Sequence, residues 1–285
     1  MLKNIGSIEN QGYELSIESD NLTGAFSWTT AFNIAFNRNK VLELGGEEYK
    51  EMAEGEGHLK TGSVRRLIVG EPIGVFYGYR FDGIFQNEEE CKQQTSSASP
   101  IGVGLRRYKD LNGDGKVDAA NDREILGDAN PKFFGGLTNT FAYKGFELNV
   151  FLQYSYGNKI LNYNAMELEN PTGGQNAYAD MVNRWTPENQ NAKYPRLSSQ
   201  SNANNYQANT VWLADRSFLK LRNAEVYYRF PEEWMKKTKI LGSAKLYVRG
   251  TDLFCSDHID VTDPECYGVA TPLNKSVVVG VTIGF

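Results

Sequence analysis

The chain has 285 residues, and its 30 lysines and arginines against 35 aspartates and glutamates give a formal net charge of −5. It carries no basic stripe that would follow a phosphate backbone, which argues against nucleic acid as a partner. Its 2 histidines and 3 cysteines show no metal-ligand spacing, so the sequence offers no basis for a zinc site.

Residues 25–37, AFSWTTAFNIAFN, alternate between large apolar and smaller polar side chains. The apolar parity holds Phe26, Trp28, Phe32, Ile34 and Phe36. A period of two is typical of a strand with one apolar and one polar face. The sequence therefore predicts a strand here, and weaker signals predict further strands at 13–19, 64–69 and 73–81.

The segment YKDLNGDGKVD, residues 108–118, reproduces the first half of a calcium-binding loop. In such loops alternate residues turn oxygen atoms inward, and a glycine allows a sharp bend. The predicted ligands of a structural Ca²⁺ ion are Asp110, Asn112, Asp114, the Lys116 carbonyl, Asp118 and Asp122. Counted from Asp110, the closing acid falls at position 13 instead of 12, so one extra residue must be absorbed. The alternative is a solvated turn without a metal.

The flanks of this loop do not predict the two helices of an EF-hand. Gly102 and Gly104 before the loop, and Pro131 after it, oppose stable helices. We therefore expect a structural clip that orders the loop 82–133, and not a calcium sensor.

The segment FELNVFLQYSY, residues 146–156, repeats the alternation, with Phe151 as the large apolar exception on the polar parity. That parity holds Glu147, Asn149, Gln153 and Ser155. With the run 137–143 and the Lys144–Gly145 turn, it predicts a hairpin with arms long enough to cross a bilayer at a tilt. The polar side chains would line a hydrophilic interior, where they either contact a solute or only solvate the wall.

Two weaker strands are predicted at 217–230 and 244–254, and the chain ends in VVVGVTIGF, an alternating strand that closes on Phe285. In all, about nine strands are expected. Their short connections are 20–23, 70–72, 144–145 and 231–242, and their long connections are 38–62, 82–133, 158–216 and 255–275. Short and long connections alternate strictly. This asymmetry indicates an all-β, antiparallel transmembrane β-barrel segment with short periplasmic turns and long extracellular loops.

Aromatic residues occur both at the predicted strand ends and in the predicted loops. Trp28, Phe36, Tyr154 and Tyr156 are candidates for interfacial aromatic belts. Loop aromatics either stack on sugar rings or pack the loops; they are Tyr163, Tyr178, Trp185, Tyr194 and Tyr206. Cys255 and Cys266 lie close enough in sequence to form a disulfide in an oxidising compartment, or to remain thiols.

Four runs of the sequence together resemble one known family. They are GEPIGVFYGYRFDGIFQ (70–86), the segment from YKDLNGDGKVD to GNKI (108–160), NRWTPENQNAKYPRL (183–197) and RSFLKLRNAEVYYRFP (216–231). In content and order they resemble the C-terminal part of the SusC/RagA family of TonB-linked outer-membrane transporters, and the resemblance covers nearly the whole chain.

The resemblance implies a 22-stranded barrel with an internal plug, of which residues 1–285 would be the C-terminal portion, without the plug and the N-terminal strands. It also implies import of oligosaccharides or peptides, a SusD-like surface lipoprotein and the TonB complex as partners, contact with outer-membrane lipid, and a terminal aromatic, Phe285, that is read during barrel assembly.

The sequence thus predicts a non-enzymatic segment of an outer-membrane nutrient importer, with glycans as the expected substrate. We found no catalytic constellation. The alternative is a secreted calcium-binding β-sandwich that binds carbohydrate, with a dockerin-like loop. A sandwich would have two sheets packed face to face and turns every 8 to 12 residues, whereas the barrel has long strands with an exposed apolar parity.

Overall fold

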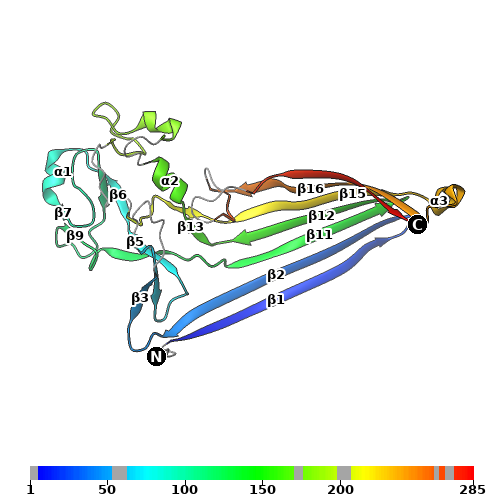
Figure 1. The fold of residues 1–285 in the computed structure, drawn as a ribbon. Helices are drawn as coiled ribbons and strands as arrows, with labels where there is room; N and C mark the ends of the chain where they lie inside the picture. Colours follow the sequence, from blue (N-terminus) through cyan, green and yellow to red (C-terminus); the bar gives the residue numbers. More distant parts are fainter. Residues whose placement is uncertain (1–5, 53–62, 170–175, 198–206, 260–262, 267–272) are drawn as a thin grey trace.

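Seven long antiparallel strands form the main sheet of the computed structural model, which describes residues 6–52, 63–169, 176–197, 207–259, 263–266 and 273–285. Their order in the sheet follows their order in the chain (Figure 1). The strands are β1 (Ser7–Thr23), β2 (Phe26–Glu43), β11 (Phe133–Tyr143), β12 (Phe146–Tyr156), β15 (Phe218–Arg229), β16 (Ser243–Asp257) and β17 (Ser276–Gly284).

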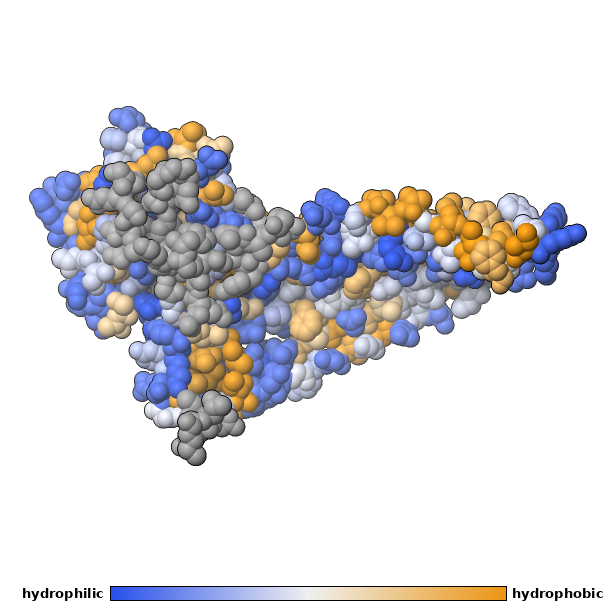
Figure 2. All heavy atoms as spheres, viewed as in Figure 1, coloured by the Kyte–Doolittle hydropathy of each residue, from blue (hydrophilic) through white to orange (hydrophobic). Residues whose placement is uncertain are grey.

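The register of the strands places the apolar parities on one face of this sheet. One cross-strand row contains Ile17, Phe32, Leu137, Leu152 and Leu221. In β17, Val277, Val279 and Val281 are 67%, 68% and 59% exposed, so the apolar face is open to the surroundings. Figure 2 shows apolar residues gathered on the strands towards the end where the chain terminates. An exposed apolar face on long strands confirms the barrel-type sheet and does not fit a sandwich, in which that face would be covered.

Aromatic rings cover two adjacent glycines of β11. The Tyr154 ring crosses Gly135, and its hydroxyl donates to the carbonyl oxygen of Asn33 at 2.8 Å. On the other face, a Cβ atom at Gly136 would lie 2.7 Å from the Phe151 ring. Phe151 therefore fills the space left by a glycine on the polar face, which explains the exception in the alternation.

The connections alternate between a turn end and a loop end of the sheet (Figure 1). The turn end holds the connections 24–25, 144–145 and 230–242, of which the last contains the helix α3 (Glu232–Thr238). The loop end holds the connections 44–132, 157–217 and 258–275. Short and long connections therefore alternate, as predicted, and the predicted short connections 20–23, 144–145 and 231–242 have counterparts at the turn end. The predicted short connection 70–72 is wrong, because these residues lie within the connection 44–132 at the loop end.

Two predicted strands lie outside the main sheet, so it contains seven strands and not about nine. Residues 65–68 and 75–79 form β4 (Arg65–Ile68) and β5 (Val75–Tyr79), which pair with β3 (Tyr49–Met52) and β10 (Arg123–Gly127) in a separate sheet. Four of the five residues of β5 are buried, including both parities. A strand covered on both faces belongs to a globular core, whereas a barrel strand keeps one parity exposed.

The loop end contains its own hydrophobic core. Its main cluster is built by Val64, Phe76, Leu161, Tyr163, Ala165, Met166, Ala208 and Trp212, and a second by Tyr79, Ala98, Tyr108 and Val117. The remaining elements there are β6 (Phe81–Ile84), α1 (Glu88–Gln93), β7 (Thr95–Ser96), β8 (Arg106–Tyr108), β9 (Lys116–Val117), β13 (Lys159–Leu161), α2 (Tyr163–Leu168), η1 (Ala179–Asn183) and β14 (Leu213–Asp215). The described parts of the loops therefore pack around cores of their own. No helix in the described ranges is long and apolar enough to cross a membrane.

Candidate functional site

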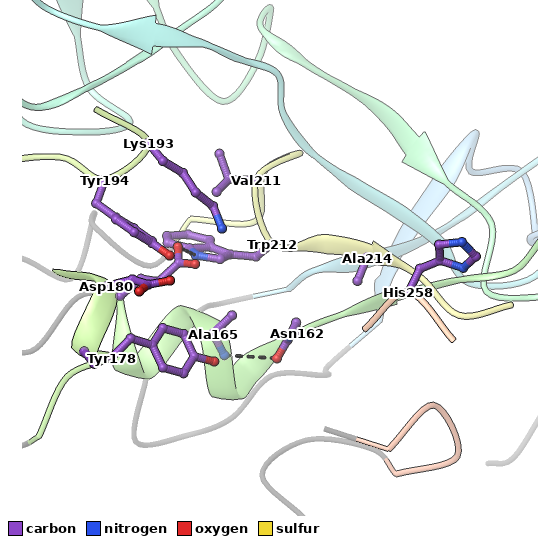
Figure 3. A pocket seen from close by; sticks show the side chains of 12 residues that line it. Asn162, Ala165, Tyr178, Asp180, Lys193, Tyr194, Val211, Trp212, Ala214 and His258 are labelled. Atoms are coloured by element: carbon purple, nitrogen blue, oxygen red, sulfur yellow. Dashed lines mark hydrogen bonds between the residues drawn. The ribbon is translucent and has the colours of Figure 1, made fainter. Parts of the chain in front are cut away.

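A cavity of about 570 Å³ lies among the loops at the loop end (Figure 3). It is lined by Asn162, Ala165, Glu169, Tyr178, Ala179, Asp180, Lys193, Tyr194, Val211, Trp212, Ala214 and His258. These residues come from five separate stretches of chain between residues 162 and 258. The lining combines aromatic rings with amide, acidic and basic groups, which is the composition of a site that orients a polar ligand.

Local hydrogen bonds fix one wall of the cavity. The Asn162 side chain caps α2 by accepting the Ala165 backbone N–H at 3.0 Å. Its own backbone N–H donates to the Trp212 carbonyl at 2.8 Å. Because β13 pairs with β14 directly beside these residues, the helix start and Trp212 are held against each other.

A buried pair of opposite charges, Arg106 and Glu169, lies beside Trp212. Trp212 Nε1 donates to Glu169 Oε2 at 3.0 Å, and Arg106 Nη2 lies 3.4 Å from the same oxygen. The Arg106 guanidinium carbon is 4.6 Å from the centre of the Trp212 ring. Burial lowers the pKa of Arg106, while Tyr108 and Glu169 beside it favour its charged form. The pair leaves this wall close to neutral and rigid.

Several of the lining side chains gather at one end of the cavity. In Figure 3, Lys193, Asp180 and Tyr194 gather near Trp212, whereas His258 lies apart from them beside Ala214. The predicted loop aromatics Tyr163, Trp185 and Tyr194 are only 1%, 7% and 6% exposed, which fits their packing interpretation. Tyr178 borders the cavity, and Tyr206 lies outside the described residues.

The predicted calcium loop is ordered by its own backbone amides. Asp110 accepts the Gly113 and Gly115 N–H groups, each at 2.7 Å, and Asp114 accepts the Lys116 N–H at 2.8 Å. Asn112 accepts the Asp114 N–H at 3.2 Å. Gly113 and Gly115 have φ values of 76° and 80°, which favour glycine.

Asp122, at the displaced thirteenth position, closes the loop from a fully buried site. Its two carboxylate oxygens accept the Leu111 and Asp118 N–H groups at 2.8 and 2.7 Å. The Asp118 side chain is bound by Lys116 Nζ at 2.9 Å, a hydrogen bond that lowers the pKa of Asp118. The extra residue is thus absorbed by a turn in which Asp118 also accepts the Ala120 and Asn121 N–H groups at 3.0 Å.

The donor set of this loop suits calcium in its chemistry, since Ca²⁺ takes oxygen ligands. Each carboxylate oxygen has about two acceptor positions, so an amide hydrogen bond does not exclude a metal bond. Among the described residues, however, no three acidic, histidine or cysteine side chains are gathered as a metal site. The amide network alone already accounts for the order of the loop.

A second charged cluster, which sequence reasoning missed, lies on the polar face of the sheet. Lys220, only 2% exposed, lies 2.7 Å from Asp263 and 2.6 Å from Glu265. Arg222, at a bulge in β15, binds Glu265, Asp252 at 2.6 Å and Gln153 at 2.8 Å. The cluster ties the segment 263–266 to the sheet.

The polar parity of β12 is engaged in contacts within the wall. Gln153 accepts from Arg222, Asn149 donates to Thr140 at 3.0 Å, and Ser155 donates to Asn158 at 3.4 Å. These contacts fit the interpretation that the polar parity solvates the wall.

Two other predicted features lie outside the cavity. Phe285 follows β17 at the turn end and is 90% exposed. Cys255 and Cys266 do not form a disulfide.

Comparison with known sequences gives a consistent set of relatives, although no family model matches the chain. TonB-dependent receptor P3 of Formosa agariphila is 36% identical over 93% of this chain and 26% of its own length. TonB-dependent receptor P26 of the same organism is 32% identical over the same shares. TonB-dependent receptor SusC of Bacteroides thetaiotaomicron is 25% identical over 93% of this chain and 25% of its own length. The chain spans about a quarter of the length of these relatives.

Solved structures show the same fold. The RagAB peptide transporter matches with a TM-score of 0.78 and 23% identity, over 99% of this chain and 30% of that chain. The RagAB peptide importer in its open-open state matches with a TM-score of 0.76 and 23% identity, over 99% and 29% of the two chains. The seven-stranded sheet with its packed loops is therefore arranged as in these proteins.

Proposed function

Since the chain corresponds to the C-terminal part of a TonB-dependent outer-membrane transporter of the SusC/RagA family, we propose that it forms wall and extracellular loops of a glycan importer. The observation that carries this proposal is the seven-stranded sheet, which has one exposed apolar face and one polar face. Such a sheet separates lipid from a hydrophilic interior.

The edges of the sheet support the proposal that further strands complete the barrel. Within the described residues, β1 pairs only with β2, and β17 pairs only with β16. An unpaired strand edge cannot face hydrocarbon, because its amide and carbonyl groups would lack hydrogen-bond partners. We propose that strands of the longer protein pair with both edges, and that its remaining part supplies the plug.

The proposed partners lie on the two sides of the membrane. The relatives are named TonB-dependent, which supports energy supplied by the TonB complex from the periplasmic side. A SusD-like lipoprotein would cover the loop end, where the loops are packed into a broad surface. The names SusC and RagAB of the relatives support this pairing.

For the substrate, we propose an oligosaccharide that contacts the loop cavity near Tyr178, Asp180 and Lys193. Polar groups beside aromatic edges suit a ligand with many hydroxyls. A peptide is the second candidate, since the structural neighbour RagAB is described as a peptide importer.

The test is binding of oligosaccharide and peptide panels to the full-length protein with its lipoprotein, measured by calorimetry. We expect oligosaccharide binding, and about tenfold weaker binding in Asp180→Ala, a loss of roughly 1.4 kcal/mol. Val182→Ala is the matched control, because Val182 lies on the same turn, is 76% exposed and does not line the cavity. Binding of peptides alone would refute the glycan proposal, and unchanged binding in Asp180→Ala would refute the role of the cavity.

We also propose that the loop 110–122 holds a structural Ca²⁺ ion. Its ligands would be Asp110, Asn112, Asp114, the Lys116 carbonyl, Asp118 and Asp122. The sequence pattern and the oxygen chemistry support this assignment. The ion would stiffen a loop whose ends already belong to the packed loop core.

A further inference from the structure

The connection between β15 and β16 differs from the other two at the turn end. The connections β1–β2 and β11–β12 consist of residues 24–25 and 144–145, whereas residues 230–242 join β15 to β16 and form the helix α3. Two residues are enough to reverse a hairpin. The additional residues of this connection therefore need another explanation.

The connection carries large apolar side chains on its surface. Trp234 is 53% exposed and Ile240 is 71% exposed, whereas Met235 is the buried residue of α3. The helix contacts β16, so it lies against the end of the sheet. Two such exposed side chains on one short connection are unusual for a surface turn in water.

A column of aromatic rings joins Trp234 to the apolar face of the sheet. The ring centres of Phe146 and Tyr228 are 4.5 Å apart, those of Tyr228 and Phe230 5.1 Å, and those of Phe230 and Trp234 6.3 Å. Phe146 and Tyr228 are paired neighbours on the apolar parity. Trp234 therefore extends the membrane-facing surface beyond the ends of the strands.

The same connection carries positive charge. Lys236 and Lys237 lie in the last turn of α3, and Lys239 follows it; all three are exposed. Lys236 lies 3.7 Å from Glu232, whereas Lys237 and Lys239 take part in no ion pair among the described residues. Exposed lysines beside exposed apolar side chains are the composition of a surface that binds lipid headgroups.

We propose that residues 230–240 form an interfacial anchor in the periplasmic leaflet of the outer membrane. Trp234 and Ile240 lie at the boundary between headgroups and acyl chains, where an indole ring is favoured. Lys237 and Lys239 lie beside the phosphates of phospholipid headgroups. The proposal rests on the outer-membrane location and on the periplasmic position of the turn end; it does not depend on the substrate.

The ring column decides between a lipid and a protein as the occupant of this surface. A periplasmic protein could also cover an aromatic and cationic patch, but it would approach from below the rim. The column instead connects Trp234, through Phe230 and Tyr228, to Phe146 on the apolar face of the sheet. The surface is continuous with the membrane-facing sheet.

The test measures the depth of a spin label at Ile240→Cys in the full-length protein, reconstituted in phospholipid nanodiscs with its other cysteines replaced by serine. Collision rates with oxygen and with a water-soluble nickel complex report the depth. We expect an oxygen-to-nickel ratio several-fold higher at position 240 than at Glu233→Cys, an exposed position on the same connection. Equal ratios at the two positions would overturn the proposal and would indicate a protein partner.

Two further measurements complete the test. The heat needed to unfold each labelled protein on electrophoresis checks that it is folded, and Trp234→Cys is the second label position if Ile240→Cys is not. Nanodiscs of phosphatidylglycerol should bury the label more deeply than those of phosphatidylcholine, and Lys237→Gln/Lys239→Gln should remove the difference. The same depth in both lipids would overturn the role of the lysines.

Discussion

Glycines in the sheet show how single residues set the local geometry. Gly135 and Gly136 stand side by side in β11, and each is covered by an aromatic ring from β12 on a different face of the sheet. The alternation of the sequence predicts both faces. It does not predict that Phe151 and Gly136 meet, because that contact depends on the register of the two strands.

A valine at Gly136 should destabilise the sheet. Its Cβ would lie 2.7 Å from the Phe151 ring, so the ring has to leave its position. We expect a loss of about 1 to 3 kcal/mol, the usual cost of overpacking, measured as a lower unfolding temperature on electrophoresis of the full-length protein. Thr138→Val is the control on the same strand and face. Phe151→Leu should restore part of the loss; no recovery would mean that the clash is elsewhere.

The sequence predicts the role of one charged loop residue, Asp122, but not the pairing of charged residues that lie far apart in the chain. Asp122 is recognisable as the displaced acid of the calcium pattern, and it does close the loop. The Arg106–Glu169 pair joins residues that are 63 positions apart, and nothing in either local sequence indicates the other. Burial raises the pKa of Glu265, but hydrogen bonds from Arg222 and Lys220 outweigh it, so its pKa lies below the usual value.

At the scale of elements, strands were predictable where the alternation was long. The four strongest runs became β2, β11, β12 and β17. The runs 64–69 and 73–81 were assigned to the wall, yet they belong to the loop core, because a short apolar run does not show whether one face or both are covered. The cavity combines five segments of the loop end, and no periodicity predicts how loops pack.

The calcium loop is the element whose ion remains a prediction. Chelation with EGTA should make the loop 82–133 of the full-length protein more sensitive to protease, because the ion would stiffen it. Asp110→Asn/Asp114→Asn should be sensitive without chelation, and Glu89→Gln, exposed on the neighbouring α1, should behave as the unchanged protein. Identical digestion with and without EGTA would show that the amide network alone holds the loop.

The terminal strand gives a prediction about assembly. Phe285 is 90% exposed at the turn end, so its side chain contributes little to the packing of the described sheet. Deleting it should reduce the amount of transporter inserted in the outer membrane several-fold, because the terminal aromatic is expected to be read by the assembly machinery. Surface labelling of cells measures this amount, and Phe285→Tyr, which keeps an aromatic ring at this position, is the control. Normal surface levels would contradict the role.

For the whole molecule, the all-β fold predicted from the sequence is confirmed by the structure and by its likeness to the RagAB peptide transporter, and the similar sequences carry names of the predicted family, TonB-dependent receptor and SusC. These properties were predictable because several motifs in a fixed order carry them together. The substrate class was not, since it depends on loop packing and on parts of the longer protein.

The unequal strand lengths give the wall an uneven height. β2 begins and β11 ends at the turn end, where Phe26 pairs with Tyr143, but β2 has 18 residues and β11 has 11. Residues 37–43 therefore continue beyond β11 for about 23 Å of strand, at roughly 3.3 Å per residue. The sheet is therefore higher at β1 and β2 than at β11 and β12. The extended part of β2 pairs with β1 on one side. On the other side Val41 exchanges backbone hydrogen bonds with Gly70 and Glu71 at 2.8 and 2.9 Å, so the longer strand braces the loop core against the sheet.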